Sequence, residues 1–153
     1  MNTTFRLAPW ADVLYAMDAA WWDRHLDEVR RVFGGRKVNP WGAMGRDVER
    51  VRGDLPRNSG AAAIALAAMW GARRIVLLGY DCQKTGGRSH WHGDHPAGLG
   101  NAGSIHRWPA IFDKVAASLR GRVQVVNATE HTALKCFPRV PLCEALGMKE
   151  PVQ

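Results

Sequence analysis

The sequence predicts an α/β fold, with a parallel sheet flanked by helices in a single domain over residues 1–153. Short apolar runs alternate with longer stretches of helical periodicity, which is typical of parallel strands joined by helices. Residues 75–78 are uniformly apolar, as expected of a central strand buried on both faces. The length of 153 residues suits one domain with its own core.

The first predicted strand covers residues 11–18 and ends in the carboxylate of Asp18. Residues 21–33 predict a helix, because their apolar side chains recur near helical spacing. Gly34 and Gly35 end that helix. A strand followed at once by a helix is the first half of a crossover between parallel strands.

The next part of the chain has weaker patterns and one clear helix. Residues 37–45 predict a loop or a short strand, and residues 46–52 predict one or two polar helical turns. Residues 61–70 predict a helix that is apolar on all sides and therefore buried. Asn58 or Ser59 is its expected N-cap, because short polar side chains accept hydrogen bonds from first-turn N–H groups.

The second half repeats the alternation of strands and helices. The strand at residues 75–78 is followed, after a long loop, by a helix over residues 108–119 with a proline in its first turn. Residues 122–127 predict the next strand. The tail from Thr132 contains two prolines and predicts irregular structure with one short helix over residues 142–146.

The composition narrows the class of protein and its partners. The net charge is +7, but the arginines are scattered and no nucleic-acid-binding motif is present, so small anions such as nucleotides are favoured over nucleic acid. No stretch predicts a membrane span or a secretory signal, and the three cysteines lack a paired spacing. We therefore expect a cytoplasmic protein with reduced thiols and no membrane partner. The composition identifies no cofactor.

Residues that end the predicted strands are the first candidates for a binding site. In open α/β sheets, ligands lie beyond the carboxyl ends of the strands. Asp18 ends the first strand, and Tyr80 and Asp81 follow the strand at residues 75–78. Asn127 is a weaker candidate at the end of the third strand. Alternatively, either aspartate simply caps the helix that comes next.

The start of the apolar helix is a second candidate. Asn58, Ser59 and Gly60 lie where unpaired N–H groups and the helix dipole attract anions. Glycine at this point also allows a ligand to approach the backbone. The same three residues equally fit an ordinary N-cap without a ligand.

A loop rich in imidazole follows the strand at residues 75–78. His90, His92 and His95 lie close together, shortly after Arg88. Histidine suits both anion contact and proton transfer near neutral pH. We expect these four residues to contact an anionic ligand. If the protein is an enzyme, His90, His92 and Asp81 are the candidate catalytic residues.

Two other interpretations of this loop stay open. Residues 90–95 match H-x-H-x-D-H, the metal signature of the metallo-β-lactamase fold, in which imidazole and carboxylate bind zinc. That fold places the motif directly after a strand and needs further ligands downstream, so we assign no metal ligand here. A different metal site in the loop remains an alternative. The other interpretation is a surface loop held together by hydrogen bonds from its imidazoles.

Five stretches together resemble small uncharacterised phage and prophage proteins; they cover residues 8–12, 18–22, 58–60, 77–81 and 89–95. That group is similar in turn to a Rossmann-like superfamily. The superfamily includes bacterial sialyltransferases, flagellin-modifying motility accessory factors and archaeal hydroxymethyldihydropterin pyrophosphokinases. The near resemblance covers most of the chain, and the distant one covers mainly its middle part.

The resemblance implies roles for particular residues. Ser59 and Gly60 would contact a nucleotide, Asp81 would help to form the site, and a histidine of the imidazole-rich loop would act as the base. Relatives usually begin with a strand and a glycine-rich turn that binds phosphate. This chain begins at Met1 without that unit, so the expected fold is Rossmann-like but lacks the N-terminal glycine-turn strand.

These features lead to three hypotheses on function. The first is a phage-type protein that binds a nucleotide or other phosphorylated small ligand, and thereby sequesters a host defence nucleotide signal. The second is a glycosyl- or phosphoryl-transferase with a nucleotide-linked donor and a histidine base. The third and weakest is a DNA-associated phage protein. Four of the seven tryptophans lie in the first third of the chain, and the missing strand would expose a sheet edge, so we also expect a homo-oligomer.

Overall fold

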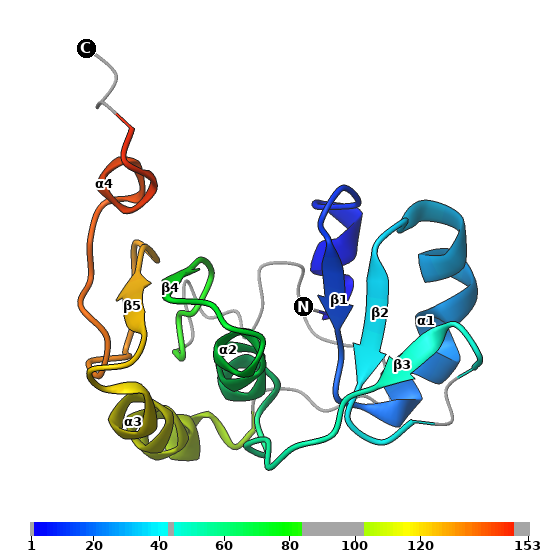
Figure 1. Ribbon diagram of the computed structural model, residues 1–153, viewed down its shortest axis with the longest axis horizontal. Helices are drawn as coiled ribbons and strands as arrows, with labels where there is room; N and C mark the ends of the chain where they lie inside the picture. Colours follow the sequence, from blue (N-terminus) through cyan, green and yellow to red (C-terminus); the bar gives the residue numbers. More distant parts are fainter. Residues whose placement is uncertain (1, 43–44, 84–102, 149–153) are drawn as a thin grey trace. The chain divides into compact units, whose positions relative to one another are not determined.

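The computed structural model describes residues 2–42, 45–83 and 103–148 (Figure 1). These residues form two compact units, the first extending to Ala63 and the second beginning at Ile64. Each unit contains a small parallel sheet flanked by helices, so the protein has a mixed α/β fold. No helix in the described part of the chain is long and apolar enough to span a membrane.

The first unit contains a three-stranded parallel sheet in the order β1-β2-β3. Its strands are β1 (Val13–Tyr15), β2 (Arg36–Asn39) and β3 (Val48–Arg50). The helix α1 (Ala19–Val32) joins β1 to β2 and covers one face of the sheet (Figure 1). The 3-10 helix η1 (Asn2–Arg6) precedes β1.

The core of the first unit is built on the two tryptophans of α1. Trp21 and Trp22 are nearly fully buried, with an edge-to-face contact of 5.1 Å between ring centroids. Phe5 packs on Trp21 in a second edge-to-face contact at 5.9 Å. The buried side chains of α1 recur near helical spacing, which explains why this segment forms an amphipathic helix against Leu14 and Val48.

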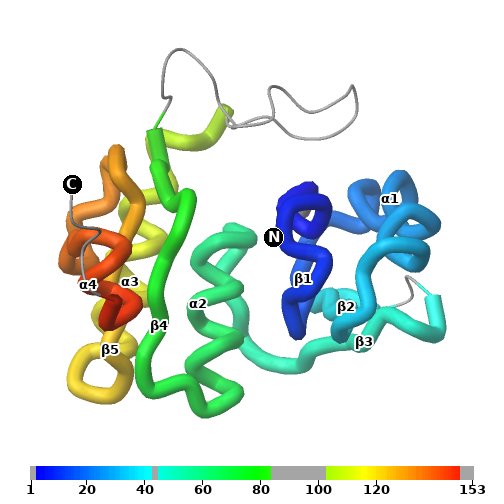
Figure 2. Tube along the Cα trace, turned by 90° about the horizontal axis from the view of Figure 1, so that it is seen from above, coloured from blue at the N-terminus to red at the C-terminus, as the bar shows by residue number. Residues whose placement is uncertain are grey.

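The second unit contains a two-stranded parallel sheet made of β4 (Arg74–Leu77) and β5 (Gln124–Asn127). In this pair of strands, Arg74 lies opposite Gln124 and Leu77 lies opposite Asn127. The other elements are α2 (Ser59–Met69), η2 (Ile105–Arg107), α3 (Trp108–Leu119) and α4 (Leu142–Leu146), and Figure 2 labels the three α-helices. The boundary between the two units falls within α2.

The structure confirms most of the expected elements. The helices expected at residues 21–33, 61–70, 108–119 and 142–146 correspond to α1, α2, α3 and α4. The alternation of strand and helix does produce parallel pairing, as expected. The first strand is shorter than expected, because Asp18 lies at the N-cap position of α1 and not in β1.

Three expectations need correction. Residues 46–52 were expected to be helical, but they contain β3, in which Val48 is buried and Glu49 pairs with Arg36 of β2 at 2.8 Å. Cross-strand contacts outweigh the polar local pattern there. The C-terminal end of α2 is not buried, since Met69 is 52% exposed. In the described residues β4 pairs with β5 alone and Leu78 lies outside it, so the central, fully buried strand is not confirmed.

Candidate functional site

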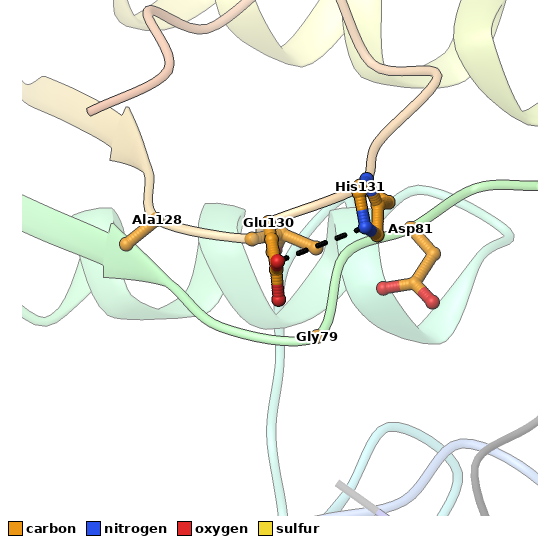
Figure 3. Close-up of a pocket in the computed structure, with 6 residues that line it drawn as sticks. Gly79, Asp81, Ala128, Glu130 and His131 are labelled. Carbon is orange, nitrogen blue, oxygen red and sulfur yellow. Dashed lines mark ion pairs between the residues drawn. The ribbon is translucent and has the colours of Figure 1, made fainter. Parts of the chain in front are cut away.

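A pocket of about 330 Å³ lies at the carboxyl ends of β4 and β5. Gly79 and Asp81 line it from the loop after β4 (Figure 3). The loop after β5 lines the rest, with Ala128, Thr129, Glu130 and His131. The pocket lies within the second unit, so its geometry depends on one sheet and the two loops that leave it.

The side chain of Asn127 fixes the loop after β5. Asn127 is fully buried, and its Oδ1 accepts a hydrogen bond from the backbone N–H of Thr129 at 3.0 Å. Its Nδ2 donates to Oγ1 of Thr132 at 3.2 Å. The turn that follows β5 is therefore folded back on the residue that ends the strand, as short polar side chains do in turns.

Two threonines tie this loop to the loop after β4. The backbone N–H of Tyr80 donates to Oγ1 of Thr129 at 2.9 Å, and Oγ1 of Thr132 donates to the carbonyl of Tyr80 at 2.7 Å. The N–H of Ala133 donates to the carbonyl of Asp81 at 2.7 Å. Because these polar groups are paired across the two loops, the pocket has a defined backbone frame.

The titratable side chains among the described lining residues are two carboxylates and one imidazole. Nε2 of His131 lies 3.7 Å from Oε1 of Glu130, and Asp81 lies beside them on the other loop (Figure 3). The side chains of His131 and Glu130 are 64% and 89% exposed. Carboxylates and imidazole accept hydrogen bonds from hydroxyl groups, and none of the described lining residues is a lysine or arginine. The described part of the lining therefore offers acceptors for hydroxyl groups of a ligand.

The arrangement does not indicate a metal centre. In the described part of the chain no three histidine, cysteine or acidic side chains are placed to hold a metal ion together. The cysteines next to the pocket are also poor ligands or nucleophiles. Burial raises the pKa of Cys82 to about 12 and that of Cys136 to about 11, so both thiols stay protonated near neutral pH.

Tyr80 lies in the chain between the pocket residues Gly79 and Asp81. Its ring makes an edge-to-face contact with Phe112 of α3, with 5.9 Å between centroids. Burial raises the pKa of the Tyr80 phenol above its ordinary value. The backbone of Tyr80 also carries bonds between the two loops, and contact of its side chain with a ligand stays a prediction.

Asp18 and Asn58 lie in the first unit, at helix starts. Asp18 occupies the N-cap position of α1 without a side-chain hydrogen bond to the helix. Oδ1 of Asn58 accepts a hydrogen bond from the N–H of Ala61 at 3.0 Å, which is the ordinary role of an N-cap. Ser59 and Gly60 form the first turn of α2. Their contact with a ligand stays a prediction, as does that of Asp18.

The remaining expected site residues, Arg88, His90, His92 and His95, lie outside the described residues. The structure in turn adds Glu130 and His131, which the sequence reasoning did not consider as site residues. A signal for both was present, because they follow closely on Asn127 at the end of a strand. Asp81 is the expected residue that the structure does place in the pocket.

Comparison with protein-family models, with curated proteins and with solved structures finds no match to this chain. The function is therefore argued from the pocket itself.

Proposed function

We propose that the pocket at the ends of β4 and β5 binds a nucleotide-type ligand, and that the chain is a Rossmann-like binding module. The convergence of Asp81, Glu130 and His131 at the carboxyl ends of two parallel strands carries the proposal. This is where α/β sheets bind nucleotides, and an acidic side chain commonly accepts hydrogen bonds from the ribose hydroxyls there. A volume of about 330 Å³ lies at the lower end of the range for small-molecule sites.

In this proposal, the acidic pocket and the net positive charge of the chain recognise different parts of the nucleotide. The acidic pocket takes the ribose, and the overall charge of +7 attracts the phosphates to the surface. In a phage-type protein, such binding would serve to sequester a nucleotide signal of host defence. We include in this proposal that the chain is related to the small phage proteins and, more distantly, to the sialyltransferase-like superfamily.

Isothermal titration calorimetry tests the proposal with ribonucleotides and with their 2′-deoxy and 3′-deoxy counterparts. Asp81→Asn and Glu130→Gln should each weaken ribonucleotide binding by about tenfold, because a hydrogen bond to a charged group contributes about 1.5–3 kcal/mol. Glu144→Gln is the matched control, since Glu144 is an exposed carboxylate on α4 that does not line the pocket. If deoxynucleotides bind as tightly as ribonucleotides, or if no nucleotide binds, the proposal is wrong.

A second candidate function is group transfer from a nucleotide-linked donor. The imidazole of His131 in the pocket, 3.7 Å from Glu130, favours it, because histidine is the most common general base. In this case His131→Gln should abolish turnover of a nucleotide sugar while the affinity for the nucleotide changes little. Binding of nucleotides without any turnover by the unaltered protein would leave the binding module as the function.

A further inference from the structure

Four arginines gather at the end of the β4–β5 sheet that is opposite the pocket. Arg73 and Arg74 lie at the start of β4, while Arg120 and Arg122 lie in the turn between α3 and β5. All four are exposed. The two turns lie at the same end of the second unit (Figure 2). We refer to these four residues as the arginine cluster.

Backbone hydrogen bonds hold the two halves of the cluster next to each other. The N–H of Gln124 donates to the carbonyl of Arg73 at 2.8 Å, and Arg74 is the register partner of Gln124. The N–H of Arg122 donates to the carbonyl of Leu119 at 2.9 Å, which fixes the turn that follows α3. Arginines far apart in the sequence are thus brought together at the amino ends of β4 and β5.

The arginines of the cluster form no close ion pair with the acidic side chains that the structure describes. Other arginines there form close ion pairs, such as Arg6 with Glu28 at 2.6 Å and Arg30 with Asp47 at 2.7 Å. None of the four clustered arginines has such a partner among the described residues. One basic residue near the end of a helix complements the helix dipole. At one end of the sheet, four positive charges without ion-pair partners in the described part of the chain repel one another unless an anionic partner binds.

An exposed aromatic side chain lies beside the cluster. Trp70, directly after α2 and shortly before Arg73, is 44% exposed, and the neighbouring Met69 is 52% exposed. Arginines next to a partly exposed aromatic side chain are a combination that binds single-stranded nucleic acid, in which arginines contact phosphates and bases stack on rings.

We propose that the arginine cluster and Trp70 form a binding surface for single-stranded nucleic acid. The phosphate backbone lies along Arg73, Arg74, Arg120 and Arg122, and one base stacks on Trp70. The surface is separate from the nucleotide pocket, because it lies at the amino ends of β4 and β5 and shares no residue with it. It therefore goes beyond the proposed function and does not depend on it.

Fluorescence anisotropy of a labelled oligodeoxythymidine, measured over a series of salt concentrations, tests this surface. Four phosphate contacts on a single strand contribute about 3 to the slope of log affinity against log salt. Changing all four arginines to glutamine should reduce the slope by about that amount, and Arg120→Gln with Arg122→Gln should reduce it by about half as much. Trp70→Ala should weaken binding by about tenfold, with little change of slope.

The matched control changes four exposed arginines of the first unit to glutamine, namely Arg24, Arg31, Arg52 and Arg57, and so removes the same total charge. If the control lowers the slope as much as the cluster variant does, binding depends on net charge alone and the proposed surface is wrong. Equal affinity for duplex DNA, with no effect of Trp70→Ala, would overturn the assignment to a single strand. The two-arginine variant decides the question if the four-arginine variant does not fold, as judged by circular dichroism.

Discussion

Replacing Asn127 with leucine should destabilise the protein and loosen the pocket together. Asn127 is fully buried at the end of β5 and bonds with both of its side-chain polar atoms. Leucine has a similar size but provides neither an acceptor nor a donor. The change therefore removes polar partners with little change of volume, and its effect reports on the hydrogen bonds.

The expected loss of unfolding free energy follows from the two groups that lose their hydrogen bonds to Asn127. The N–H of Thr129, a residue that is 7% exposed, would lose its acceptor, and a buried unsatisfied donor costs about 1–3 kcal/mol. The bond to Thr132 adds about 0.5–1.5 kcal/mol, and Oγ1 of Thr132 keeps its bond from the N–H of Leu134. We expect a total loss of about 2–4 kcal/mol, which corresponds to a melting temperature lower by about 4–16 °C.

Thermal unfolding followed by circular dichroism measures this loss. Gln124→Leu is the control, because Gln124 lies on the same strand but is exposed, and its replacement should change stability by no more than about 0.5 kcal/mol. A loss below about 1 kcal/mol for Asn127→Leu would refute the reasoning, because it would mean that Thr129 finds another partner. A loss equal to that of the control would lead to the same conclusion.

Four further predictions follow. Burial lowers the pKa of His25, and Arg6 of η1 adds a smaller lowering contribution. The stability of the protein should therefore fall as the pH falls below the ordinary histidine pKa of 6.5. His25→Gln should remove that part of the pH dependence in thermal melts. Asn58→Ala should cost about 1 kcal/mol in chemical unfolding, whereas Asn58→Asp should cost much less because it keeps the capping oxygen. Replacing His90 and His92 with alanine should leave the melting temperature nearly unchanged but weaken nucleotide binding about tenfold, and unaltered binding would place the site elsewhere. Light scattering at micromolar concentration should show a homo-oligomer, and a monomer would contradict the expected self-association.

The sequence by itself determined the fold class and the positions of the helices. Apolar residues at helical spacing predicted α1 correctly, and the proline in its first turn predicted α3 correctly, because both are local properties of the chain. Asn58 was correctly predicted as an N-cap for the same reason. Asp81 was expected to end its strand, but β4 ends at Leu77 and Asp81 lies in the loop that follows, where it lines the pocket.

Only the tertiary structure decided what depends on pairing between distant segments. β3 was misjudged as helical, because its strand conformation is supported by Val48 in the core and by the pairing of Glu49 with a neighbouring strand. Glu130 and His131 became site residues through hydrogen bonds that join two loops far apart in the sequence. The arginines looked scattered along the chain, and the register of β4 with β5 brings four of them to one edge, because parallel strands align segments that local sequence cannot relate.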